Sequence, residues 1–408
     1  MNYPSRHSLL LCVVVVSVSH AADATNLPTE PTFIDALTAG KTSLNLRLRH
    51  ELVDDNAQPK NANASTLRTR LSYASAAWHR LSAGLEFDYV SAFGTDRFND
   101  TRNGQAAFPV VPDPDGADLN QAFLRYARPS ANLSVGRQRL NLANQRFIGG
   151  VGWRQNEQTF DAIRGQFTPL KNLSVDYSYI DNTQRIFGPD TGKPAARLDS
   201  DHHALLINWA ARPELNVTAY GYWLDFSDAP ALSSRTLGAS LTGDIKRPRV
   251  TFDYRIEAAR QSDYGNNPVA FVANYHHLVL GARVAGVRLG IGEELLGGDA
   301  SAGVALQTPL ATVHAFQGWA DKFLTTPASG VKDHYVDLST VRFGLGLKAA
   351  WHGYAADVGG ASLGQEWNLQ ASKKFLQRYT FTAKFADYRA QAFARDTQKV
   401  WLMAEASF

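Results

Sequence analysis

The last ten residues of the chain alternate between apolar and mixed positions. One phase is wholly apolar and contains Val400, Leu402, Ala404, Ala406 and Phe408. The other phase is mixed and contains Trp401, Met403, Glu405 and Ser407. A period of two is typical of a β-strand with one apolar face. Because this strand ends on an aromatic residue in its apolar phase, it is typical of the closing strand of a membrane barrel, where unpaired backbone groups cannot face hydrocarbon.

The same alternation recurs upstream and predicts a series of strands. In the first of them the leucines of residues 44–52 share one face, and the polar residues, mostly charged, share the other. The expected strands cover 44–52, 67–78, 81–89, 119–127, 131–140, 159–167, 172–182, 202–210, 214–226, 236–245, 250–260, 275–284, 287–295, 333–340, 344–357, 366–375, 379–389 and 399–408.

Short turns and long loops alternate between these strands. Pro129, Pro213 and Pro248 fall in short turns, where they remove no hydrogen-bond donor from a sheet. Long polar connections cover 94–116, 141–158 and 297–332. Residues 310–319 could form another strand, but an odd total would put the C-terminus on the wrong side. The pattern predicts an all-β, transmembrane, up-and-down antiparallel barrel of about 18 strands, with 16 as the alternative.

The N-terminus resembles a secretory signal. Arg6 and His7 precede an apolar run that contains Cys12, the one cysteine, and small residues follow up to Ala21 and Ala24. We therefore expect a signal peptide at 1–21, a lead-in at 22–40 and the barrel at 41–408. The mature chain is exported without cysteines, so disulfides cannot hold it together. These features predict the outer membrane of a Gram-negative bacterium.

Composition narrows the function classes. Beyond the signal, no apolar stretch approaches the roughly 18 residues of a membrane helix. The net charge of +3 gives no argument for nucleic acid as a partner.

If the apolar phases face lipid, the charged residues of the opposite phases line the lumen, because charge is costly on the lipid side. The basic candidates on strands are Arg47, Arg49, Arg68, Arg70, Arg125, Arg255, Arg288, Lys348 and Lys384. The acidic ones include Glu51, Glu86, Asp88, Asp176, Asp253, Glu257, Glu294 and Glu405. One interpretation is that these charges pair across strands and keep the wall polar. The other is that unpaired arginines on the first two strands guide an anionic solute.

The loop at 141–158 contains Gly149, Gly150 and Gly152, but no helix and no Lys-Ser/Thr pair follows. A nucleotide site is therefore excluded in favour of a loop that folds into the lumen as a constriction, with Arg146 and Arg154 at the narrow point.

Enzymatic and metal sites find little support. Adjacent histidines at 202–203 and 276–277 point to opposite faces of a strand and cannot share a metal. Residues 113–118 are rich in Asp but lack the bidentate Glu of a calcium loop. We expect no metal, no cofactor and no catalytic residues. An outer-membrane hydrolase with a dispersed Ser/His site is the minor alternative.

Several segments resemble the alginate export family of outer-membrane proteins. They are Gly136-Arg137-Gln138, the stretch from Arg146 through Trp153-Arg154-Gln155-Asn156 to Thr159-Phe160-Asp161, and residues 307–324. Residues 119–126 resemble the fourth strand of that family. The resemblance implies an 18-stranded barrel whose electropositive lumen passes a polyuronate. It also implies pore or loop positions at Arg146, Trp153, Arg154, Asp161, His314, Trp319, Asp321 and Lys322.

The sequence thus predicts a channel for passive export or diffusion of an anionic polysaccharide such as alginate or a related uronate-type sugar. The alternative is a general or small-organic-acid porin on the same barrel, and a soluble sugar-binding β-sandwich is a further reading. The mixed lining differs from a strongly basic conduit, so a related anionic or neutral sugar also stays open. Expected partners are the lipid bilayer, lipopolysaccharide, the solute and periplasmic export proteins, with no nucleic acid.

Overall fold

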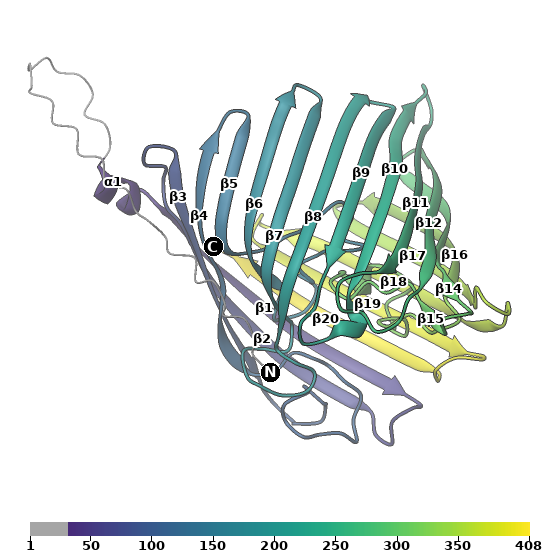
Figure 1. Ribbon diagram of the computed structural model, residues 1–408. Helices are drawn as coiled ribbons and strands as arrows, with labels where there is room; N and C mark the ends of the chain where they lie inside the picture. The colour runs from purple at the N-terminus through teal and green to yellow at the C-terminus, as the bar shows by residue number, and fades with distance from the viewer. Residues whose placement is uncertain (1–31) are drawn as a thin grey trace, which may run out of the picture.

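The computed structural model describes residues 32–408, and the expected signal peptide at 1–21 lies outside them. Each alternating segment pairs with its neighbours along the chain, and the resulting antiparallel sheet has 18 strands within the described residues (Figure 1). The strands are β1 (Lys41–Asp55), β2 (Ala62–Ala74), β3 (Leu81–Ala92), β4 (Gly116–Arg128), β5 (Ala131–Gln138), β6 (Thr159–Leu170), β7 (Leu173–Gln184), β8 (Arg197–Arg212), β9 (Leu215–Leu224), β10 (Ser234–Lys246), β11 (Thr251–Asp263), β12 (Val272–Val284), β13 (Val287–Leu296), β16 (Val331–Arg342), β17 (Leu345–Ala355), β18 (Ser362–Phe375), β19 (Tyr379–Ala390) and β20 (Thr397–Ser407).

The sheet closes between its first and last strands. Asn45 of β1 lies opposite Ser407 of β20, and the register continues to Asp55 opposite Thr397. Beyond Ser407, the backbones of Leu44 and Phe408 exchange two hydrogen bonds of 3.0 and 2.9 Å. Closure leaves no unpaired strand edge, as a sheet in hydrocarbon requires. The predicted 18-stranded barrel is therefore confirmed, and both the 16-stranded alternative and the two-sheet sandwich are wrong.

The connections fall into two classes at opposite ends of the barrel. The connections at the end where β1 begins and β20 stops are short, for example 129–130 between β4 and β5 and 285–286 between β12 and β13. We call this the turn side. Those on the other side, the loop side, include the long loops 93–115, 139–158, 185–196 and 297–330.

Small elements fill some of the connections. A two-stranded hairpin of β14 (Gly298–Asp299) and β15 (Val304–Ala305) and the 3₁₀ turn η2 (Val313–Ala315) lie in loop 297–330, and η1 (Pro230–Leu232) precedes β10. Residues 310–319 form no strand, as expected. The helix α1 (Phe33–Thr38) precedes β1 on the turn side, and its Phe33 packs edge-on against Trp78. Within residues 32–408, no helix is long and apolar enough to cross a membrane.

The outer face of the wall is apolar. Leu48, Leu71, Ile256, Leu289 and Leu402 all point outward and are exposed. Charged residues in the opposite phase point into the barrel and are buried there, as Arg49 and Glu51 are on β1. This is the arrangement expected of strands with acyl chains on one side and a polar lumen on the other.

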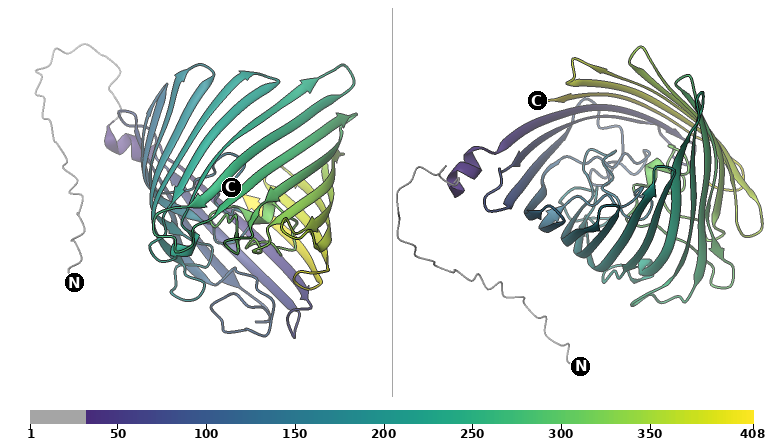
Figure 2. Two further views of the ribbon diagram at one scale, coloured as in Figure 1. Left: turned by 45° about the vertical axis from the view of Figure 1, so that its right-hand side comes forward. Right: turned by 90° about the horizontal axis from the view of Figure 1, so that it is seen from above.

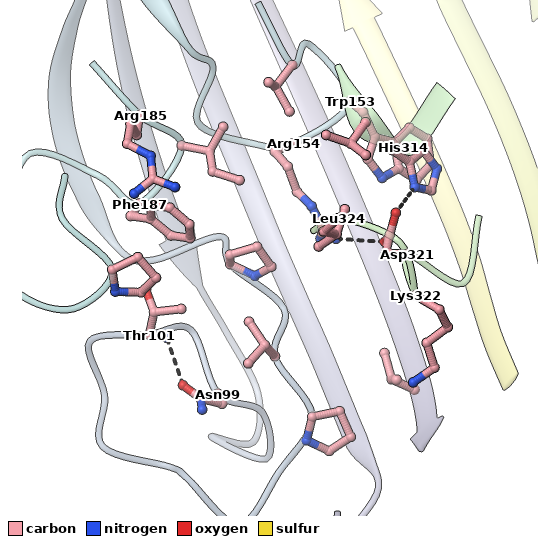
Figure 3. A pocket seen from close by; sticks show the side chains of 18 of the residues that line it. Asn99, Thr101, Trp153, Arg154, Arg185, Phe187, His314, Asp321, Lys322 and Leu324 are labelled. Atoms are coloured by element: carbon pink, nitrogen blue, oxygen red, sulfur yellow. Dashed lines mark hydrogen bonds and ion pairs between the residues drawn. The ribbon is translucent and has the colours of Figure 1, made fainter. Parts of the chain in front are cut away.

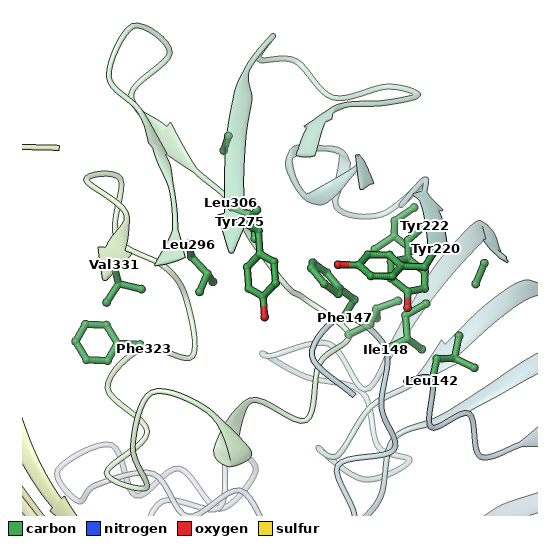
Figure 4. Close-up of a cluster of buried hydrophobic side chains, with 14 of the residues drawn as sticks. Leu142, Phe147, Ile148, Tyr220, Tyr222, Tyr275, Leu296, Leu306, Phe323 and Val331 are labelled. Carbon is green, nitrogen blue, oxygen red and sulfur yellow. The ribbon is translucent and has the colours of Figure 1, made fainter. Parts of the chain in front are cut away.

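The lumen is partly filled by two loops. Loops 139–158 and 297–330 fold inside the ring of strands (Figure 2) and pack on its inner surface. Phe147 contacts the rings of Tyr220, Tyr222 and Tyr275, at centroid distances of 5.5, 5.4 and 5.3 Å (Figure 4). The inner face of β9 and of part of β12 is therefore apolar, because it buries apolar side chains of loop 139–158 instead of meeting water.

Candidate functional site

Arginines of β1 point into the lumen and hold loop 139–158 across it. Arg47 donates to Gln155 Oε1 at 3.1 Å and to the carbonyl oxygens of Gly152 and Arg154, both at 2.9 Å. Arg49 donates to the carbonyl oxygen of Trp153 and forms an ion pair of 3.1 Å with Asp113. These hydrogen bonds go to backbone carbonyl groups, so the two arginines fix the path of the loop backbone.

The arginines of β2 differ in how fully they are bonded. Arg70 forms a two-pronged pair with Asp88, at 2.7 and 2.6 Å, and reaches Glu157 of the loop at 2.8 Å. Arg68 donates only to Asn45 Oδ1, at 2.7 Å, while its Nη1 lies 3.8 Å from Glu157. The Nε and Nη1 groups of Arg68 are buried and have no hydrogen-bond partner. Arg68 is thus less fully hydrogen-bonded than Arg70.

Arg154 joins the two lumenal loops to the wall. Its guanidinium lies 3.1 Å from Glu51, 3.4 Å from Asp321 and 3.9 Å from Asp113. Burial by itself would raise the pKa of Asp113, but Arg49 and Arg154 outweigh burial and hold it below its ordinary value. Asp113 therefore serves as an anionic anchor for arginines of the wall and of loop 139–158.

A second junction is built from His314 and a lysine among aromatic rings. The ammonium of Lys384 on β19 lies 3.8 Å from the ring centre of Trp319 and 4.0 Å from that of Trp153. It also lies 2.8 Å from His314 Nε2, and His314 Nδ1 lies 2.7 Å from Asp321 (Figure 3). Because the lysine donates to Nε2, the proton of the neutral ring is on Nδ1, which donates a hydrogen bond to Asp321. Burial lowers the pKa of His314 to about 3, so the ring is neutral.

An ion pair with β20 also stabilises this junction. Asp321 accepts from Lys399 of β20 at 2.8 Å, and the ring of His314 stacks on Trp153 at 4.3 Å. Burial would raise the pKa of Asp321, but Lys399 and the other donors around it hold it well below its ordinary value. We call His314, Asp321, Lys384 and Lys399 the latch, because these four residues fasten loop 297–330 to β19 and β20.

Most of the remaining predicted residues also have partners. Arg146 pairs with Glu294 at 2.8 Å and stacks on Phe316. The cross-strand and loop pairs are Arg255–Glu257 (2.7 Å), Arg288–Asp253 (2.7 Å), Arg288–Asp337 (2.6 Å), Asp161–Arg137 (2.8 Å), Glu86–Arg139 (2.8 Å) and Lys322–Asp55 (2.7 Å). Lys348 lies 5.5 Å from the Trp319 ring, and Arg125 is exposed with Phe123 beside it. The structure therefore favours the interpretation in which most lumenal charges pair.

Two cavities lie on either side of loop 139–158. The loop-side cavity, of about 730 Å³, is bordered by loops 93–115, 139–158, 185–196 and 297–330 (Figure 3). The turn-side cavity, of about 440 Å³, is lined by Arg47, Arg68 and Arg70 together with Glu157 and Glu405. Three of the arginines predicted on the first two strands border the turn-side cavity, namely Arg47, Arg68 and Arg70, and Arg49 does not. His314, Asp321 and Lys322 border the loop-side cavity.

Some site residues were not singled out from the sequence. Glu157, Arg139 and Arg185 lie in loops, where no alternation indicates which way a side chain points. The neighbouring histidines do face opposite ways: His202 is buried and accepts from the backbone N–H of Asp225, whereas His203 lies 2.7 Å from the Tyr177 hydroxyl at the exposed face.

Comparison with known proteins places these features in a family. The alginate export family model matches residues 41–279. No curated protein matches the sequence. Among solved structures, Acinetobacter baumannii OccAB4 superposes with a TM-score of 0.73 at 16% identity, over 91% of this chain and 98% of that one. Pseudomonas aeruginosa OccK9 (OpdG) gives 0.72 at 16% identity, over 91% and 99%, and OpdK with vanillate gives 0.70 at 13% identity, over 91% and 99%. At these identities the structures share the fold.

Proposed function

The chain belongs to the alginate export family, and we propose that it lets anionic solutes diffuse passively through its lumen, without turnover chemistry. It is a porin-type barrel of the Gram-negative outer membrane, so the short turns face the periplasm and the long loops face outward. The turn-side cavity is then the periplasmic entrance, and the loop-side cavity is the outer one.

One observation carries the proposal. The row Arg47, Arg68 and Arg70 borders the turn-side cavity, and buried donors of Arg68 remain unfilled there. Three guanidinium groups face two carboxylates in this lining, so the local charge favours an anion over a neutral solute. Glu157 and Glu405 line the same cavity and keep an anion from being held too tightly to leave.

Two solute classes fit this arrangement. Membership of the family supports an anionic polysaccharide such as alginate. Three features support the alternative, a porin for small organic acids: two loops fill part of the lumen, most lumenal charges are already paired, and one structure with this fold, OpdK, was crystallised with vanillate. A polymer needs a continuous row of free cations, whereas a small acid needs one or two.

Conductance block in planar bilayers tests the proposal. We expect stepwise conductance in KCl, with block by an oligouronate or a small carboxylate at lower concentration than by a neutral oligosaccharide. Equal block by the neutral sugar contradicts the proposed anion preference. Block by oligouronate below the concentration needed for a small acid supports the polysaccharide, and the reverse order supports the small-acid porin.

A further inference from the structure

We propose that the loop-side cavity is a binding site for small ring-bearing carboxylates, with Arg185 as the residue that receives the carboxylate. The inference rests on the proposed function and narrows its solute class. It concerns the outer cavity, which the arginine row of β1 and β2 does not border.

Apolar side chains from three loops form part of the wall of this cavity. Its loops contribute Pro109, Val110 and Pro112 from 93–115, Phe187 from 185–196, and Val313 and Leu324 from 297–330. Val110 is 46% exposed and Leu324 is 56% exposed. Apolar groups gathered in a concave site are typical of small-molecule binding, because a ligand with an apolar body removes them from water.

Arg185 is an unneutralised cation in this wall. Its Nη1 donates to the carbonyl of Ala195 at 3.1 Å, and its guanidinium lies 4.6 Å from the ring centre of Phe187. Within residues 32–408, no carboxylate forms an ion pair with it. Burial, and then the neighbouring Arg102, lower its pKa from the ordinary value, and the charge of a bound anion opposes that shift.

The other cations of the cavity differ from Arg185. Lys322 pairs with Asp55 at 2.7 Å, Lys399 pairs with Asp321 at 2.8 Å, and Arg154 is held by Glu51. Lys193 is exposed, and attracts anions without a fixed geometry. Among the cations that line this cavity in the described part of the chain, Arg185 is therefore the one partly buried guanidinium that no carboxylate pairs with (Figure 3).

The chemistry of the lining selects between acids. A guanidinium binds a carboxylate with two parallel hydrogen bonds, and the Phe187 ring beside it offers a face on which a second ring stacks. A uronate carries a hydroxyl on nearly every carbon, and the Phe187 ring beside Arg185 offers those hydroxyls no hydrogen-bond partner. The volume of about 730 Å³ lies in the usual range for small-molecule sites.

Calorimetry on the purified full-length barrel in detergent tests the inference. The probes are benzoate, glucuronate, which has the same charge but no apolar ring, and benzyl alcohol, which has the ring but no charge. We expect benzoate to bind about tenfold more tightly than either. Arg185→Gln is expected to remove that preference over benzyl alcohol, and Arg185→Lys to restore part of it. Arg197→Gln is the matched control, since Arg197 is 60% exposed, pairs with Asp199 and does not line the cavity.

Retention of the folded, unheated gel position shows for each variant that the barrel is intact. The inference is overturned if glucuronate binds as tightly as benzoate, or if Arg185→Gln binds benzoate as the unchanged protein does. Conductance in KCl is measured on the same preparation. A conducting barrel without benzoate preference refutes this inference alone, whereas a barrel that never conducts refutes the proposed function.

Discussion

The latch predicts that mild acid loosens loop 297–330. His314 is neutral in the latch because burial lowers its pKa to about 3, whereas a released, solvated imidazole has its ordinary value of 6.5. Between those values the released loop binds a proton that the latched loop does not. Stability of the latched state is therefore complete above about pH 6.5 and falls as the pH decreases.

The size of the effect follows from the same two values. Each pH unit below 6.5 costs the latched state about 1.4 kcal/mol, so pH 5 costs about 2 kcal/mol, a factor of roughly 30 in the latching equilibrium. Of the groups that face His314, Asp321 has a pKa well below 3.8 when latched, so its own contribution is lost only in stronger acid. Lys384 and Arg154 act in the same direction as burial, since both disfavour a second cation.

Hydrogen exchange measures this opening. After correction for the intrinsic pH dependence of exchange, amides of residues 311–324 should exchange about 30-fold faster at pH 5 than at pH 7, while those of β19 and β20 stay protected. His314→Gln is the control, because an amide can still donate to Asp321 and accept from Lys384 but does not titrate. Equal pH dependence in His314→Gln, or no change between pH 7 and pH 5, would show that His314 does not control the release of loop 297–330.

Three further predictions concern the lumen. Burial raises the pKa of Glu157, but Arg70 and Arg139 outweigh burial and hold it at about 2, so the side chain is anionic. Glu157→Gln therefore removes one negative charge beside these two arginines, which keep their pairs with Asp88 and Glu86, and reversal potentials should show greater anion preference. Arg68→Gln should shift the reversal potential toward cations, whereas Arg197→Gln should leave it unchanged, and equal shifts would count against the lumenal role. Phe147→Ala should cost loop 139–158 about 3–5 kcal/mol of packing and expose it to protease while the strands stay protected; an equally resistant loop would contradict this.

The strands were predictable because lipid and water impose a period of two that the sequence must follow. Their ends were less so. β2 begins at Ala62, five residues before the expected 67. The prediction began late because residues 62–66, Ala-Asn-Ala-Ser-Thr, contain no large apolar side chain that would mark a lipid-facing phase. Near the loops the strands extend beyond the hydrocarbon of the membrane. Lipid no longer requires alternate apolar side chains there, although the hydrogen bonds between strands continue.

The interior was less predictable. In strand β9, both phases from Val217 to Leu224 consist of apolar or small residues. A run of this kind indicates that the inner face of the strand packs against a loop and not against water. The structure places Arg47, Arg49, Arg68 and Arg70 in the lumen, but their partners in the loops lie up to 108 residues away along the chain. Period and charge indicate a direction for a side chain. They do not indicate which distant loop will occupy its hydrogen bonds.

A sealed barrel with cationic lumenal positions favours anions over cations. The most direct test is the reversal potential of single channels across a KCl gradient in planar bilayers. We expect stepwise conductance and a reversal potential displaced toward that of chloride. A displacement toward potassium, or no conductance from barrels that keep their folded gel position, would contradict the account.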